Sequence, residues 1–523
     1  MPFHSVLPLA LLALCTGALA QTPCDGPAVD PVDGTLYPCE NAALLGRLPL
    51  LDMGVALNGA NPYRGNDIWG WTDPQTGQRY ALVGNQSGTF FVDVTDPADL
   101  RPLGALLTET VPTTWRDIKT YASHAFIVAD GAGDHGMQVF DLTRLRGLSA
   151  DADRRFDADV VYYGSGSNTI DSAHNVAVNE DTGYAYIVGA SDCAGGLHMV
   201  DIQDPTSPTF AGCFSADGYT HDVQCVVYSG PDDDYTGREI CLAANEDDIA
   251  IVDVTVKSNP TLVAHAFYPN VAYAHQGWLD PSHRYFVSND ELDEISGFVP
   301  STRTLLFDFA DLDAPELRYE YFHPTQATDH NLYIRRNVVF ETNDKAGLRL
   351  LRLGTEPALA PLATIGYLDT YPESDLNGFD GAWSVYPFFG DDTLPITSIV
   401  SDRTRGLFVV AGPFTTGAGD DVPLAADDPL GRDDPADAVR LSVAPNPFSV
   451  QTTLSVTVDA SQSVRVTLYD ALGRQVATPF AGLLPAGVPQ AIRVDGADLP
   501  PGTYFVRVDG EGVSATRPLV RAR

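Results

Sequence analysis

A pattern that repeats seven times along the chain restricts its fold more than any other feature. Each copy begins with aspartate, histidine or tryptophan and continues into residues typical of a short strand, starting at residues 67, 117, 174, 221, 275, 330 and 383. A second element, a short apolar run, follows each start and in most copies ends in aspartate, as in Phe91-Val92-Asp93 and Ile251-Val252-Asp253. With about four strands in every period, the pattern predicts seven blades of a β-propeller.

Closure of such a ring needs a strand from outside the last repeat. That repeat ends near Pro413, soon after its third strand at residues 406–410. Residues 44–52 (LLGRLPLLD) resemble the fourth strand of other repeats, and we expect them to complete the seventh blade, which would remove exposed sheet edges. The expected fold is therefore all-β, with a seven-bladed propeller over residues 44–413 closed by an N-terminal strand.

The rest of the chain differs in composition from the repeats. Residues 414–438 are rich in aspartate, proline, glycine and alanine, which is typical of an acidic flexible linker. Residues 439–523 alternate apolar and polar residues between short turns, as in residues 503–508, and predict a small β-sandwich.

The first residues indicate export. Residues 1–20 contain an apolar run ending in small residues, and Ala18 and Ala20 fit a signal-peptide cleavage pattern. This run is too short to span a bilayer. Cleavage would leave a segment of residues 21–43 before the propeller.

Six cysteines would remain after cleavage, and disulfides are the usual state of cysteines in an exported chain. Six cysteines allow 15 pairings. Proximity along the chain favours three pairs: Cys24–Cys39, Cys193–Cys213 and Cys225–Cys241.

The balance of charge excludes some partners. The 31 basic and 69 acidic residues give a formal net charge of −38. Non-specific nucleic-acid binding needs a basic face, so it is excluded, and anionic membrane surfaces are disfavoured for the same reason. Acidity of this degree serves either solubility or the binding of cations.

Several long stretches have a familiar form, among them TWRDIKTY (114–121), HNVAVNEDTGYAYIVG (174–189) and GAWSVYPFF (381–389). They resemble the choice-of-anchor B family, which is built on LVIVD-type repeats, and the resemblance covers most of residues 65–410. It implies a propeller-like domain that different anchors attach to the cell surface, and it implies no particular enzymatic activity.

The end of the chain carries a second resemblance. Ala444-Pro445-Asn446-Pro447-Phe448, then LYDALGRQV (468–476) and LPPGTYFVRV (499–508), are similar to the C-terminal sorting domain of type IX secretion. This implies the type IX secretion machinery as a partner, and a protein that is secreted or held on the outer membrane exterior. Many such tails are removed when the cargo is attached.

Four histidines occupy the same position in successive repeats. In a propeller the start of the innermost strand lies near the central channel, so equivalent residues converge there. The candidate ligand-binding residues are His174, His221, His275, His330, Asp117, Asp222 and Trp383. Histidines with carboxylates suit a transition metal. The alternative is structural, with each histidine forming a hydrogen bond across its own blade.

An acidic loop forms a second candidate site. Asp290, Glu291, Asp293 and Glu294 lie within five residues and could offer oxygen ligands to calcium. The loop matches no known calcium-loop pattern, so a solvated surface loop is the alternative.

Familiar catalytic motifs such as G-x-S-x-G and H-E-x-x-H do not occur, so no catalytic residue is assigned. The main hypothesis is a non-catalytic module that binds a protein, glycan or small ligand outside the cell. The alternative is an extracellular hydrolase or lyase that uses the axial histidines and aspartates, with or without a metal. A structural surface-layer component is a third hypothesis.

Overall fold

The computed structural model describes residues 22–54, 64–354 and 362–416 and, with short gaps, residues 439–521. The expected signal peptide and most of the expected linker lie outside these residues. The chain divides into two compact units, Met1–Val422 and Pro423–Arg523. In the described part, the regular structure is nearly all β.

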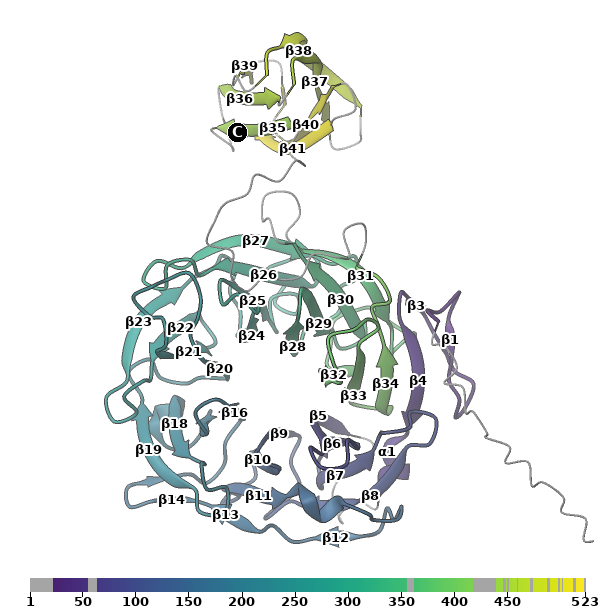
Figure 1. Cartoon of the computed structure of the whole chain (residues 1–523), viewed down its shortest axis with the longest axis vertical. Coiled ribbons are helices and arrows are strands. Elements are labelled where there is room, and N and C mark those ends of the chain that lie inside the picture. The colour runs from purple at the N-terminus through teal and green to yellow at the C-terminus, as the bar shows by residue number, and fades with distance from the viewer. Residues whose placement is uncertain are drawn as a thin grey trace, which may run out of the picture. The chain divides into compact units, whose positions relative to one another are not determined.

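Seven sheets of four or five strands form a ring in the first unit. One edge strand of each sheet, its innermost strand, borders the centre of the ring (Figure 1). We number these sheets I to VII in chain order. Sheet I contains β5 (Gly65–Thr72), β6 (Arg79–Asn85), β7 (Gly88–Asp93), β8 (Arg101–Leu107) and β12 (Arg155–Phe156). Sheet II contains β9 (Trp115–Tyr121), β10 (His124–Asp130), β11 (Met137–Asp141) and β13 (Val160–Tyr162). Sheet III contains β16 (Asn175–Asn179), β17 (Tyr184–Val188), β18 (Leu197–Asp201) and β19 (Thr209–Phe214).

Sheets IV to VII continue the same order from the centre outwards. Sheet IV contains β20 (Asp222–Val227), β21 (Glu239–Ala244), β22 (Ile249–Asp253) and β23 (Thr261–Ala266). Sheet V contains β24 (Ala274–Leu279), β25 (Tyr285–Asp290), β26 (Arg303–Asp308) and β27 (Glu316–Phe322). Sheet VI contains β28 (Leu332–Arg335), β29 (Val338–Thr342), β30 (Leu348–Leu353), β31 (Leu362–Leu368) and β3 (Cys39–Glu40). Sheet VII contains β32 (Ala382–Phe389), β33 (Thr397–Asp402), β34 (Gly406–Ala411) and β4 (Ala43–Leu48).

Small elements connect the sheets. Two short hairpins pair β1 (Ala28–Val29) with β2 (Leu36–Tyr37) and β14 (Gly164–Ser165) with β15 (Asn168–Thr169). Within the described ranges, the helical elements are α1 (Leu50–Met53) and the 3-10 turns η1 (Leu142–Leu145) and η2 (Cys193–Gly195).

The outer strand of sheet VII comes from the beginning of the chain. Strand β4 pairs antiparallel with β34, and Gly46 lies opposite Val409. Arg47 Nη1 also donates a hydrogen bond to the Arg405 carbonyl oxygen at 3.0 Å. The expected strand over residues 44–52 is too long at its end, because β4 stops at Leu48 and Leu50–Met53 form α1. Pro49 separates the two, and proline has no N–H to continue the ladder.

A bulge recurs on the outer strand of six sheets. The residues directly after it in the chain are Gly46, Gly104, Gly212, Ala264, Tyr319 and Gly366. At Gly46 and Gly212 a turn of the following sheet packs against the backbone. A Cβ there would lie within 3.0 Å of the carbonyl oxygens of Pro97 and Lys257, respectively. Glycine at these positions therefore permits close packing of neighbouring sheets.

The apolar core lies between the sheets. One buried cluster joins Ile68 and Val83 of sheet I to Phe389 and Val409 of sheet VII. Other clusters join sheets II and III, III and IV, IV and V, and V and VI. Burial of these side chains holds each sheet to its neighbours, and the I–VII cluster joins the first sheet to the last.

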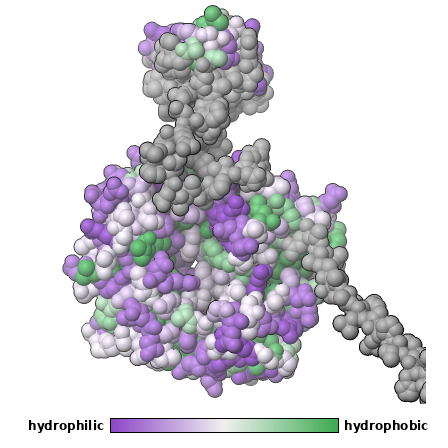
Figure 2. All heavy atoms as spheres, in the orientation of Figure 1, coloured by the Kyte–Doolittle hydropathy of each residue, from purple (hydrophilic) through white to green (hydrophobic). Residues whose placement is uncertain are grey.

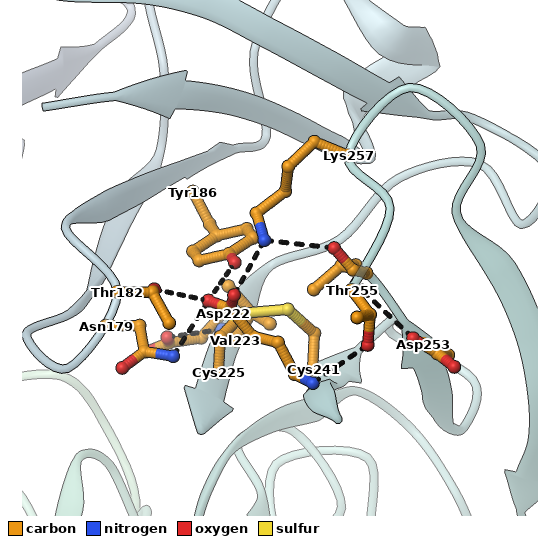
Figure 3. Close-up of a disulfide and its surroundings, with 12 residues drawn as sticks. Asn179, Thr182, Tyr186, Asp222, Val223, Cys225, Cys241, Asp253, Thr255 and Lys257 are labelled. Atoms are coloured by element: carbon orange, nitrogen blue, oxygen red, sulfur yellow. Dashed lines mark hydrogen bonds and ion pairs between the residues drawn. A yellow bond between two sulfur atoms is a disulfide. The ribbon is translucent and has the colours of Figure 1, made fainter. Parts of the chain in front are cut away.

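Three disulfides join the cysteine pairs that proximity favoured: Cys24–Cys39, Cys193–Cys213 and Cys225–Cys241. The last pair links directly opposite residues of β20 and β21. Figure 3 shows this disulfide beside Asn179, Thr182, Tyr186 and Lys257. All four of these side chains donate hydrogen bonds to the Glu239 carboxylate, which ties sheet III to sheet IV.

The second unit contains two further sheets. One consists of β35 (Val439–Ala444), β36 (Gln451–Val458) and β39 (Gln490–Asp495). The other consists of β38 (Gln475–Leu484), β37 (Gln462–Asp470), β40 (Gly502–Asp509) and β41 (Ser514–Arg521). Side chains of both sheets, such as Val456 and Val506, share one buried cluster.

The visible face of the ring is mainly hydrophilic. Figure 2 shows hydrophilic residues spread over this face, with apolar residues in small separate groups. No helix among the described residues is long and apolar enough to cross a membrane.

Candidate functional site

The innermost strands of the sheets bring residues that are distant in the sequence to a cavity at the centre of the ring. The cavity has a volume of about 350 Å³. Its lining includes Asp67, Trp115, Arg116, Asp130, His174, Tyr219, His221, Tyr273, His275, Glu291, His330, Phe379, Trp383 and Arg403. Five of the seven residues proposed from the sequence, the four histidines and Trp383, therefore meet at one place.

The four imidazoles form a continuous arc. Their ring centroids are 4.3 Å apart from His174 to His221, 4.5 Å from His221 to His275 and 4.5 Å from His275 to His330. Trp383 continues the arc at 4.6 Å from His330. Each ring stands at or just before the start of an innermost strand, so the repeat of the sequence becomes a rotation about the centre.

Hydrogen bonds of the histidines run between sheets. His221 Nδ1 donates to the backbone carbonyl of His275 in the next sheet at 2.9 Å. His174 Nδ1 lies 3.0 Å from an Asp130 carboxylate oxygen of the preceding sheet. The rings of these two residues thus bond to neighbouring sheets, whereas their backbone N–H groups bond within their own sheets, to the carbonyl oxygens of Val188 and Ala244. The buried Nδ1 atoms of His275 and His330 have no hydrogen-bond partner among the described residues.

Burial favours the neutral form of three of these imidazoles, those of His221, His275 and His330. It holds the pKa of His221 and of His275 well below the ordinary value, and neighbouring histidines add to the effect. Burial also lowers the pKa of His330 to about 3. Neutral imidazole is the form that accepts a hydrogen bond or binds a metal.

Glu291 is the acidic residue beside His275 and His330 in this arc. It follows β25, and its carboxylate oxygens lie 4.0 Å from His275 Nε2 and 3.9 Å from His330 Nε2. Burial raises the pKa of Glu291 to about 7. The preceding residue, Asp290, fixes the turn by accepting hydrogen bonds from the Tyr268 hydroxyl and from the backbone N–H groups of Ala272 and Tyr273.

Two arginines line the same cavity. Arg116 Nη2 and Arg403 Nε are buried without a hydrogen-bond partner among the described residues. Burial lowers the pKa of both guanidinium groups, that of Arg116 to about 10. Arg403 stacks over Trp383, with 5.0 Å between the guanidinium carbon and the ring centroid. The cavity thus offers cationic donors beside an aromatic surface.

Asp117 and Asp222, the other two residues proposed from the sequence, do not line this cavity. Asp117 accepts hydrogen bonds from Lys119 Nζ at 2.6 Å and from the Val176 N–H at 2.8 Å. Asp222 lines a second cavity of about 290 Å³ together with Lys119, and burial raises its pKa to about 7. Lys119 Nζ lies 3.9 Å from Asp67, which lines the first cavity, so an ion pair joins the linings of the two cavities.

The acidic loop proposed for calcium splits between different surroundings. Asp290 and Glu291 have the roles described above. Asp293 and Glu294 instead meet Asp329 from the segment before β28, with one oxygen of each within 4.8 Å of the others. All three are buried, and five of their six carboxylate oxygens have no hydrogen-bond partner among the described residues. Asp293 also forms an ion pair with the buried Arg303 at 2.7 Å.

This carboxylate cluster gives stability a distinct pH dependence. Burial and the neighbouring Asp293 raise the pKa of Glu294 from 4.5 to about 10, and Asp290 and Asp329 lie close by. The folded chain therefore holds a proton that the unfolded chain releases. The contribution of this proton to the free energy of unfolding is fully present below the pKa of Glu294 in the unfolded chain. It is lost as the pH rises toward 10, at up to about 1.4 kcal/mol per pH unit.

We expect Glu294→Gln to remove this dependence, because glutamine stays neutral at every pH. Urea unfolding between pH 5 and 9, followed by tryptophan fluorescence, should show a flatter decline of stability for the variant than for the natural chain. The exposed Glu316→Gln should leave the slope unchanged. Equal slopes for the natural chain and Glu294→Gln would contradict this assignment.

Comparisons with known proteins identify parts of the chain. A family model described as a secretion system C-terminal sorting domain matches residues 442–521, and a model of the LVIVD repeat matches residues 171–215 and 239–266. No curated protein sequence matches the chain. The sorting domain indicates a protein secreted or displayed on the outer membrane exterior and implies interaction with the type IX secretion machinery.

Solved structures show distant likeness. PorZ, described as an essential bacterial surface component of the type IX secretion system of Porphyromonas gingivalis, is 13% identical with a TM-score of 0.42. The alignment covers 90% of this chain and 61% of PorZ. The periplasmic gluconolactonase PpgL of Pseudomonas aeruginosa is 10% identical with a TM-score of 0.41, covering 67% of this chain and 91% of PpgL. Likeness of this degree carries no argument about function.

Proposed function

We propose that the protein is a seven-bladed β-propeller of the choice-of-anchor B type that acts as a non-catalytic binding module outside the cell. Sheets I to VII would be its blades, and β4 would close the ring over residues 44–413. A cleaved signal peptide (1–20), an acidic linker (414–438) and a C-terminal β-sandwich (439–523) would serve its delivery. The pairing of β4 with β34 and the apolar cluster between sheets I and VII support this architecture.

The ligand would bind in the central cavity and carry a carboxylate. The observation that supports this is the pair of arginine donors, Arg116 Nη2 and Arg403 Nε, that are buried without a partner. A buried guanidinium group is stable only when an anion or acceptor satisfies it, and a carboxylate matches its geometry. Trp115 and Phe379, which are 45% and 41% exposed, offer faces on which a sugar ring can stack. An acidic sugar combines both features.

Binding can be measured with glucuronate and its uncharged counterpart glucose. We expect glucuronate to change the tryptophan fluorescence of the protein in a saturable manner and to bind at least tenfold more tightly than glucose. Arg403→Gln should weaken glucuronate binding at least tenfold, because a charge-assisted hydrogen bond contributes about 1.5–3 kcal/mol. Arg336→Gln, at a partly exposed arginine outside the cavity, is the matched control. Equal affinity for the two sugars would refute a carboxylate site.

A lyase is the second candidate, and Glu291 is the observation that favours it. A carboxyl group with a pKa near 7 beside neutral imidazoles is suited to general acid–base chemistry. A lyase would release unsaturated products from a polyuronate, and Glu291→Gln would abolish the release. Saturable binding without any such product supports the binding module instead.

A further inference from the structure

We infer that the central cavity holds a divalent transition-metal ion of the Zn²⁺ type, bound by His221, His275, His330 and Glu291. The inference rests on the proposed function in one respect: the ion would form part of the same ligand-binding site.

The donor atoms already face one another. One ligand atom each from His221, His275 and Glu291 lies within 4.8 Å of the other two. Glu291 Oε2 is 4.0 Å from His275 Nε2, and Oε1 is 3.9 Å from His330 Nε2. These separations are too long for hydrogen bonds. They are close to the distance between two ligands that share an ion with bonds of about 2.0–2.2 Å, so a small inward movement completes the coordination.

A hydrogen bond to the neighbouring sheet holds the His221 ring in a metal-binding orientation. His221 uses Nδ1 to donate to the His275 carbonyl, which leaves Nε2 as its available donor. His174, next in the arc, has the same arrangement, with Nδ1 against the Asp130 carboxylate. A hydrogen bond from the second ring nitrogen to a carbonyl or carboxylate is the usual support of a metal-binding histidine, because it fixes both the tautomer and the ring plane.

The chemistry of the donor set selects the ion. Three imidazoles and one carboxylate suit zinc and neighbouring transition metals, whereas calcium and magnesium need a shell of oxygens. Only Glu291 among the four ligands carries charge when the imidazoles are neutral. The dication and its four ligands together would therefore have a net charge of +1. A ligand carboxylate would balance that charge while Arg403 holds its other oxygen.

The experiment uses the full-length protein after removal of metals with a chelator. Titration calorimetry with ZnCl₂ and elemental analysis should show one tightly bound equivalent, and Ca²⁺ should not compete for it. Co²⁺ in place of Zn²⁺ should give the visible absorption of a four-coordinate site. His275→Gln and Glu291→Gln should each weaken this equivalent at least 100-fold, and near-ultraviolet circular dichroism would verify that both variants are folded.

His265→Ala is the matched control, because His265 lies with Asp217 and Asp248 in another group of possible metal ligands. It should leave the tight equivalent in place. Absence of a tight equivalent in the natural protein, or its full retention in Glu291→Gln and His275→Gln, would overturn the inference. Glucuronate binding without Zn²⁺ binding refutes the metal site alone, and Zn²⁺ binding without preference for glucuronate refutes only the carboxylate ligand.

Discussion

Replacement of Gly46 by alanine is expected to lower the free energy of unfolding of the ring unit by about 2–3 kcal/mol, the cost of forcing an extra group into close packing. The new Cβ would come within 3.0 Å of the Pro97 carbonyl oxygen, a backbone atom that cannot move aside as the end of a flexible side chain can. The substitution falls in β4, where sheet VII packs against sheet I, so it strains the closure of the ring. All five tryptophans lie between residues 69 and 383, so urea unfolding followed by tryptophan fluorescence reports on this unit.

Ala264 provides the control, since it occupies the equivalent place directly after the bulge in sheet IV and already carries a Cβ. Ala264→Gly should change stability by about 1 kcal/mol or less. Gly212→Ala, which meets the Lys257 carbonyl in the same way, should be as damaging as Gly46→Ala. A Gly46→Ala protein as stable as the natural one would show that the sheets are not packed as closely as described.

Arg303→Met is expected to destabilise the ring unit by about 3–5 kcal/mol at neutral pH, the usual cost of removing one partner of a buried ion pair. Arg303 is fully buried, and its guanidinium group binds Asp293 at 2.7 Å and Glu320 at 2.8 Å. Without it, Asp293 would be left beside Glu294 and Asp329 with no cation. Chemical unfolding at pH 7 and at pH 5 measures the effect.

The loss should be smaller at pH 5, because protonation of Asp293, whose pKa burial raises to about 6, removes the unpaired charge. Arg318→Met, at an exposed arginine on the neighbouring strand β27, should cost about 0.5 kcal/mol or less. A loss for Arg303→Met no larger than for Arg318→Met would contradict the buried pair.

Much of the ring could be predicted because its units repeat. The convergence of His174, His221, His275 and His330 followed from their common position, since equivalent residues of equivalent sheets must lie at equal distances from the centre. The pairing of residues near Gly46 with the last repeat followed from the missing fourth strand. Sequence similarity to other outer strands did not reveal that Pro49 ends the strand, although the missing N–H of proline was a usable signal.

The composition of the site was harder to predict, because it depends on side chains from neighbouring sheets. Asp117 shares the position of the histidines in the repeat, yet Lys119 two residues later draws its carboxylate away. The acidic neighbours of Glu291 in the sequence indicate either a calcium loop or a solvated surface loop. Antiparallel pairing returns the end of each second strand to the start of the first, as Asp290 opposite Ala274 shows, so Glu291 could have been placed beside His275.

Asp329 of the carboxylate cluster and Arg403 of the central cavity were harder to identify from the sequence. Asp329 reaches the carboxylate cluster from the sheet that follows Glu294, and no local pattern joins them. Arg403 follows a second strand, as Glu291 does, but a single arginine in a turn is more often solvated.

The strand that closes the ring also sets an order of events during synthesis and export. Arg47 and Arg405, joined by a hydrogen bond, are 358 positions apart in the chain. The edge of β4 therefore stays unpaired until nearly the whole ring unit has been synthesised. Final closure is a late, long-range step, which is slow because distant contacts carry a high entropic cost. An unpaired strand edge is a template for pairing with other chains, so the chain is expected to be most prone to aggregation before its last repeat is complete.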